Sequence, residues 1–142
     1  MVTAPGAQSA YGYRRRLRST GPPSETTMRL EQLARQTGAR VYTHGRDVDI
    51  ELDQVYAGDR VSDLLNAAGD HALLVTNLAS THLVRLAELM DVPAICLVNN
   101  QTPDESMLTT ARQHGTWLLV SPHDLFVTCG RLYASLAGGH PA

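Results

Sequence analysis

The chain has 142 residues, 43% of them apolar, which suits one domain with a single hydrophobic core. All 12 basic residues are arginine, so a Walker A phosphate loop, a pyridoxal Schiff base and Ser-Lys catalysis, which each require lysine, are excluded. No apolar run approaches the roughly 18 residues of a membrane span, and the start lacks the apolar segment of a signal peptide, so we expect a cytoplasmic protein with no membrane partner.

Charge divides the chain into two parts. Residues 1–27 hold four arginines against Glu25, a net charge of +3, and are rich in Pro, Gly, Ser and Thr. We interpret them as a flexible tail, and residues 28–142 as one α/β domain. That domain carries a net charge of −5, so nucleic acid is not an expected partner.

The first half of the domain contains two predicted helices and two extended segments. The first helix has apolar or small residues at helical spacing and ends at Gly38, which suits a C-terminal cap: Leu30, Leu33, Ala34 and Thr37. A short strand is expected over 40–43. A second extended segment covers 50–57, with Ile50, Leu52 and Val55 facing inward. A further helix then follows, with Val61, Leu64, Leu65 and Ala68 on its apolar face.

Three short apolar runs dominate the second half of the domain. They cover 72–75, 94–98 and 117–120, and their starts lie 22 and 23 residues apart. Each run is continuous rather than alternating, as expected of strands covered on both faces, and each precedes a helical pattern. Strand–helix–strand repeats of this length favour right-handed crossovers and parallel strands. The predicted fold is therefore a three-layer α/β/α domain with a mainly parallel sheet of about five strands.

Capping residues mark the ends of the later helices. Thr102-Pro-Asp-Glu105 predicts an N-cap at Thr102, and Ser121-Pro-His-Asp124 predicts one at Ser121. The helix between these runs should start at Ser80 or Thr81, and Gly115 should close the helix that follows Thr102.

Parallel topology places polar residues together at one edge of the sheet. Ligands of open α/β sheets bind at the carboxyl ends of the strands, where helix N-termini favour anions. The candidate ligand-binding residues there are Thr76, Asn77, Ser80, Thr81, His82, Asn99, Asn100, Gln101, Ser121 and His123. A phosphate, a nucleobase or a small metabolite would suit them. The alternative is that these side chains serve as caps and turns.

The sequence contains few residues or motifs typical of catalysis or metal binding. The six histidines show no metal-ligand spacing, and no HExxH, CxxC or GxSxG motif occurs, so we expect neither a metal nor a cofactor. Asp59 and Asp63 share a helical face, where they would perform acid–base work or bind Mg²⁺; alternatively they cap the helix and compensate its dipole. Cys96 and Cys129 lie in apolar segments and are predicted to be buried, reduced thiols.

Several segments in order resemble the DRTGG-domain family, over about Met28 to Leu136. Residues 28–42 are similar to the opening of stand-alone members, and Val55 to Leu65 to the family's Gly-x-x-x-Ser-Asp-Leu-Leu segment. Thr102-Pro-Asp-Glu105, Pro122 to Phe126 and Gly130-Arg-Leu-Tyr133 are similar to its closing half.

The resemblance implies a domain like the N-terminal domain of HPr kinase/phosphorylase, also found in regulated pyrophosphatases with CBS domains and in phosphotransacetylase-like proteins. It implies a regulatory role and homodimerisation, and it adds Asp59, Ser62 and Asp63 to the candidate ligand-binding residues. The kinase activity of HPr kinase belongs to a separate P-loop domain that this sequence does not contain.

Two segments depart from the family. Asn99-Asn100-Gln101 replaces its Thr-Gly-Gly, and Leu78 to His82 replaces a segment that often reads Gln-Thr-His-Pro-Asn. Losing glycines removes the freedom to adopt positive φ and the close approach of a ligand to the backbone. We therefore expect any ligand that relatives bind there to be bound differently here, or not at all.

Three hypotheses follow. The first is a non-catalytic regulatory domain that senses a nucleotide or phosphorylated small molecule and works as a homodimer. The second is a protein–protein interaction domain with no small ligand. The third is a phosphotransferase-type enzyme that uses Asp59 and Asp63.

Overall fold

A computed structural model describes residues 12–14, 28–46, 50–60 and 71–137. Its main sheet has six strands in the order β2-β6-β7-β8-β9-β4. The strands in that order are Gly12–Arg14, Gln54–Ala57, Ala72–Thr76, Ala94–Leu97, Trp117–Val120 and Arg40–Thr43. A separate antiparallel pair joins β3 (Met28–Arg29) to β5 (Glu51–Leu52).

The four central strands run in the same direction. β6 pairs with β7, β7 with β8 and β8 with β9, all in parallel, so the predicted direction of the three apolar runs is confirmed. All residues of β7, β8 and β9 are buried, as their continuous apolar sequences indicate. The two outer strands, β2 and β4, are antiparallel to their neighbours, so the sheet is mainly parallel with antiparallel edges.

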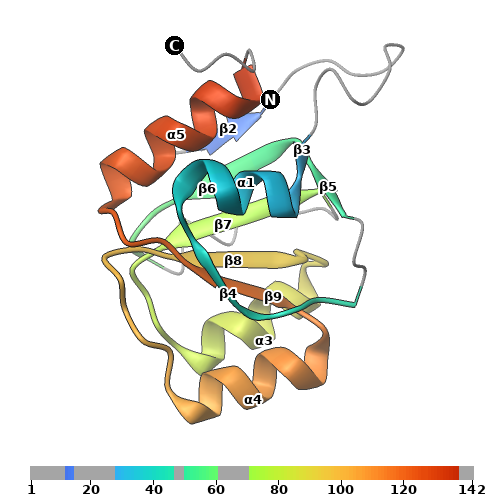
Figure 1. The fold of residues 1–142 in the computed structure, drawn as a ribbon. Helices are drawn as coiled ribbons and strands as arrows, with labels where there is room; N and C mark the ends of the chain where they lie inside the picture. Colours follow the sequence, from blue (N-terminus) through green and yellow to red (C-terminus); the bar gives the residue numbers. More distant parts are fainter. Residues whose placement is uncertain (1–11, 15–27, 47–49, 61–70, 138–142) are drawn as a thin grey trace.

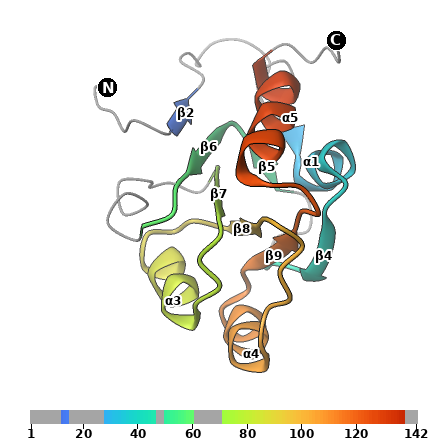
Figure 2. The same cartoon turned by 90° about the vertical axis from the view of Figure 1, so that its left-hand side faces the viewer.

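Helices cover both faces of the sheet, which confirms the three-layer architecture (Figures 1 and 2). α1 (Leu30–Thr37) and α5 (Leu125–Ala137) lie on one face, and α3 (Thr81–Leu89) and α4 (Glu105–His114) lie on the other. Successive strand residues alternate between two cores. Leu73 packs with the residues of the α1/α5 face, and Leu74 packs with those of the α3/α4 face.

Two of the predicted helix starts are wrong. α4 is capped by Asp104, whose Oδ1 accepts the Met107 N–H at 2.8 Å, and not by Thr102. Asp124 precedes α5 in the same way and accepts the Val127 N–H at 2.9 Å, so Ser121 is not the cap either. An aspartate cap adds a negative charge that the helix dipole favours, and it lies close enough to reach the third helical N–H. The Ser80 cap and the closing glycines Gly38 and Gly115 are confirmed.

The first half of the domain agrees with most of the sequence predictions. All four predicted core residues of α1 are buried, and so are Ile50, Leu52 and Val55. The extended segment 50–57 forms two strands in different sheets, β5 and β6. Gly12–Arg14, within the predicted tail, forms edge strand β2. The boundary of the domain at residue 28 stays a prediction, and the predicted helix of Val61 to Ala68 lies outside the described residues.

Candidate functional site

The carboxyl ends of β6, β7, β8 and β9 gather at one edge of the sheet, here called the carboxyl edge. After β8 the chain turns to α4 on one face, and after β9 it turns to α5 on the opposite face (Figure 2). Neighbouring strands whose connections leave to opposite faces create a switch point, where ligands of open α/β sheets bind. The loops at this switch point are residues 98–104 and 121–124.

Backbone hydrogen bonds join these two loops. The Asn99 N–H donates to the His123 carbonyl at 2.7 Å, and the Asn100 N–H donates to the Ser121 carbonyl at 2.8 Å. Both asparagines have positive φ, 63° and 55°. The expectation that loss of glycine would remove this conformation is therefore wrong, because asparagine tolerates the left-handed region better than most residues. Both asparagine residues are exposed, so two amide side chains stand in the segment where the family has Thr-Gly-Gly.

An arginine that the sequence analysis did not select reaches the carboxyl edge. β4 is antiparallel to β9, so its first residue, Arg40, lies opposite Val120 at the carboxyl end of β9. The Arg40 Nη2 donates to Asn100 Oδ1 at 3.3 Å, and its Cζ lies 5.8 Å from the centroid of the Tyr42 ring. The edge strand thus adds a guanidinium to a switch point whose predicted residues are mostly uncharged.

Four predicted ligand-binding residues hold the loops together. Thr76 is fully buried, and its Oγ1 accepts the Leu78 N–H at 3.1 Å. Ser80 Oγ accepts the His82 N–H at 3.1 Å and caps α3. Gln101 Nε2 donates to the carbonyls of Asn77 and Val98, each at 3.1 Å.

Ser121 is the fourth of these residues. It is buried, and its Oγ lies 2.8 Å from Thr128 Oγ1 and accepts the His123 N–H at 3.1 Å. For Thr76, Ser80, Gln101 and Ser121, the interpretation as caps and turns accounts for the contacts observed.

Other predicted residues present their side chains to solvent. Asn77, His82, Asn99 and Asn100 are exposed at the carboxyl edge, and His123 is half-buried there. Asp59 is exposed beyond the end of β6. Ser62 and Asp63 lie outside the described residues, so the proposed pairing of Asp59 with Asp63 stays a prediction.

The helix N-termini at this edge differ in charge. α4 begins with Asp104 and Glu105, and α5 follows Asp124, so carboxylates already offset the positive ends of these two helices. α3 is capped by uncharged Ser80 and has no acidic residue in its first turn. An anion at the carboxyl edge is therefore favoured near Arg40 and the start of α3 rather than near α4 or α5.

Both cysteines are free thiols. Cys96 is buried in β8, and desolvation raises its pKa to about 12. Cys129 is half-buried in α5, and burial raises its pKa as well. Because the thiolate is the reactive form, neither residue has the lowered pKa of a catalytic cysteine. The pKa of Cys96 is therefore higher in the folded chain, about 12, than in the unfolded chain, near 9. The contribution of this thiol to the free energy of unfolding is fully present below pH 9 and is lost as the pH rises towards 12.

Within the described residues, no group of three or more His, Cys, Asp or Glu side chains is placed to hold a metal ion. No helix in that part of the chain is long and apolar enough to cross a membrane.

Comparisons with known proteins show the fold. Neither a family model nor a curated protein matches the chain. A solved structure does: the CBS and DRTGG domains of the regulatory region of Clostridium perfringens pyrophosphatase, complexed with the activator diadenosine tetraphosphate. The TM-score is 0.63 at 13% identity, over 76% of this chain and 47% of that one. The chain thus spans about half the length of this structural neighbour, and the likeness concerns the fold alone.

Proposed function

We propose that the chain is a non-catalytic regulatory domain that senses a nucleotide or another phosphorylated small molecule at the carboxyl edge. The observation that carries this proposal is the Arg40 guanidinium, which antiparallel β4 brings to the switch point beside Asn100. Arginine presents several N–H donors in a planar fork that matches the oxygens of a phosphate group.

Side chains, and not the backbone, would hold the phosphate. The N–H groups of Asn99 and Asn100 already donate to carbonyls of the neighbouring loop, so they are not available to form a cradle like that of a glycine-rich loop. Arg40 would exchange its bond to Asn100 Oδ1 for phosphate oxygens, and the released Asn100 amide would then donate through its nitrogen. Exposed Asn77 and His82 provide polar contacts for a base or sugar further along the edge.

The structural neighbour supports a regulatory role. It is the regulatory region of an enzyme, and it is complexed with an activator that is a nucleotide. Its fold likeness agrees with the motif resemblance to DRTGG domains, and we propose that this chain belongs to that family. A domain of this kind alters a partner enzyme's activity and has no turnover of its own, in line with the few reactive groups at the carboxyl edge.

Binding of ATP tests the site at Arg40. At a concentration 100 times the Kd, ATP should stabilise the wild-type chain by about 2.7 kcal/mol and raise its Tm by several degrees. Arg40→Gln keeps a polar side chain but removes the charge, so we expect calorimetry to show at least about tenfold weaker binding.

Arg85→Gln is the matched control, since Arg85 is an exposed arginine in the middle of α3. We expect this variant to bind ATP as tightly as the wild type does. The proposal for Arg40 is wrong if Arg40→Gln and Arg85→Gln bind ATP equally well. If neither ATP nor any other phosphorylated metabolite raises the Tm of the wild type, the proposal that the chain senses such a molecule is wrong.

The outer face of α5 favours a second function, self-association. Phe126 and Tyr133 are 85% and 56% exposed, and they lie seven residues apart on one side of the helix. Large exposed aromatic side chains on one face are typical of protein interfaces. We propose that two copies of the chain pack through this face and form the homodimer that the family resemblance implies.

Light scattering at micromolar concentration should therefore report a dimer for the wild type. Phe126→Glu should give a monomer, because it places a charge in the interface, whereas Leu89→Glu should stay dimeric. Leu89 is a suitable control because it is 79% exposed on α3, on the opposite face of the sheet. A monomeric wild type would contradict the proposed dimer.

A further inference from the structure

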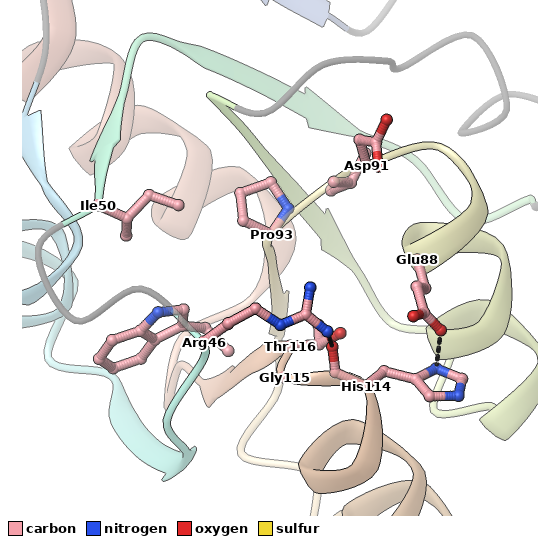
Figure 3. Close-up of a pocket in the computed structure, with 10 residues that line it drawn as sticks. Arg46, Ile50, Glu88, Asp91, Pro93, His114, Gly115 and Thr116 are labelled. Carbon is pink, nitrogen blue, oxygen red and sulfur yellow. Dashed lines mark hydrogen bonds and ion pairs between the residues drawn. The ribbon is translucent and has the colours of Figure 1, made fainter.

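A cavity of about 440 Å³ lies at the opposite edge of the sheet, where β8 and β9 begin. Figure 3 shows how it is built: α3 and α4 end at its rim, and Arg46, which follows β4, reaches across it. No sequence motif predicts this site, because its residues come from three separate stretches of the chain. They are Arg46, Ile50, Glu88, Asp91, Val92, Pro93, His114, Gly115, Thr116 and Trp117.

Arg46 provides the basic side of the cavity. Its Nη2 donates to the His114 carbonyl at 2.7 Å, and its backbone N–H donates to the Gly115 carbonyl at 2.9 Å. These bonds hold the guanidinium across the C-terminus of α4, and Figure 3 shows it extending into the cavity. Because one guanidinium carries five N–H groups, it can bind a carboxylate while keeping its bond to the helix.

Carboxylates provide the acidic side. Glu88 Oε1 lies 2.8 Å from His114 Nδ1, which links the ends of α3 and α4. Asp91 follows α3 with a φ of 59°, and Figure 3 shows its side chain at the rim beyond Pro93. The C-termini of both helices add partial negative charge. This half of the cavity therefore favours a cationic group.

Apolar side chains form the floor between these two sides. Trp117 and Val92 are almost fully buried, and Ile50 is 8% exposed. Pro93, at the entry to β8, completes this apolar surface. A ligand here meets a positive charge, two negative charges and an apolar wall.

We propose that this cavity is a second ligand site, for a small zwitterion of the α-amino-acid type with an apolar side chain. Its carboxylate binds Arg46, its ammonium group binds Asp91, and its side chain packs on Ile50 and Pro93. The volume lies within the range of small-molecule pockets. A nucleotide does not suit this cavity, because its phosphates would meet two carboxylates and two helix C-termini. The domain would then respond to two ligands, one at each edge of the sheet.

Calorimetry on the full chain tests the site with three probes of similar shape. L-leucine should bind, whereas 4-methylpentanoate, which lacks the ammonium group, and isoamylamine, which lacks the carboxylate, should each bind at least tenfold more weakly. If L-leucine, L-methionine and L-phenylalanine all fail to bind, the proposal is overturned. Equal affinity for L-leucine and isoamylamine would contradict the proposed contact between Arg46 and the ligand carboxylate.

Asp91→Asn is the decisive variant. Asparagine tolerates positive φ, so the backbone stays while the charge is lost, and L-leucine should bind at least tenfold more weakly. Arg46→Gln should have a similar effect, but it also removes a cap of α4, so Asp91→Asn decides if that variant fails to fold. Arg40→Gln, at the other edge, should bind L-leucine normally. Unchanged binding by Asp91→Asn would contradict the proposed geometry.

Discussion

Replacing Gly45 with alanine is expected to destabilise the fold by about 3 kcal/mol. A Cβ at this position would lie 2.1 Å from Cδ1 and 2.5 Å from Nε1 of Trp117. The indole cannot move aside easily, because Trp117 is 1% exposed in β9 and the His44 ring stands 4.8 Å from it, centroid to centroid. The loop or the strand must shift, and the free energy of unfolding in urea measures the cost.

Gly130→Ala is the matched control for this substitution. Gly130 lies within α5, and a Cβ there would meet nothing within 4 Å. Alanine has a better helix propensity than glycine, so this variant should gain about 0.5–1 kcal/mol. If Gly45→Ala unfolds at the wild-type urea concentration, the packing of the loop after β4 on Trp117 is not as described.

Leu74→Ala is expected to cost about 3 kcal/mol, within the range of 2–5 kcal/mol for buried leucines. Leu74 lies in the central strand β7, is 1% exposed and belongs to the core between the sheet and the α3/α4 face. Strands on both sides and helices above it leave little room to close the cavity that alanine creates. Chemical denaturation of the two proteins measures the difference.

Leu89→Ala removes the same atoms from a leucine that is 79% exposed at the end of α3. We expect it to change the stability by less than about 0.5 kcal/mol. A loss at Leu74 no greater than the loss at Leu89 would mean that β7 is not the buried centre of the sheet.

The parallel core could be predicted because its signal is local. A strand covered on both faces, such as Ala72–Thr76, reads as an uninterrupted apolar run, and equal spacing of such runs implies crossover helices. The helix starts were harder to place, because Thr102 and Asp104 are both good N-caps and stand two residues apart. Short-range rules do not decide between them.

The candidate site was predicted in part. Parallel strands explain why the residues after β7, β8 and β9 share an edge, and Asn99 and Asn100 lie there as expected. Arg40 could not be selected, because its position depends on β4 pairing in the antiparallel direction with a strand far along the chain. The cavity beside Arg46 depends likewise on long-range packing, and no motif indicates it.

A nuclear magnetic resonance titration of the isotopically labelled chain with ATP tests the central claim most directly, because it locates binding residue by residue. The account predicts that the largest amide shifts occur at Arg40, at residues 99–101 and at residues 121–123, and that they disappear in Arg40→Gln. Shifts centred on Arg46 and His114, or no shifts at saturating ATP, would contradict a phosphate-binding site at the carboxyl edge.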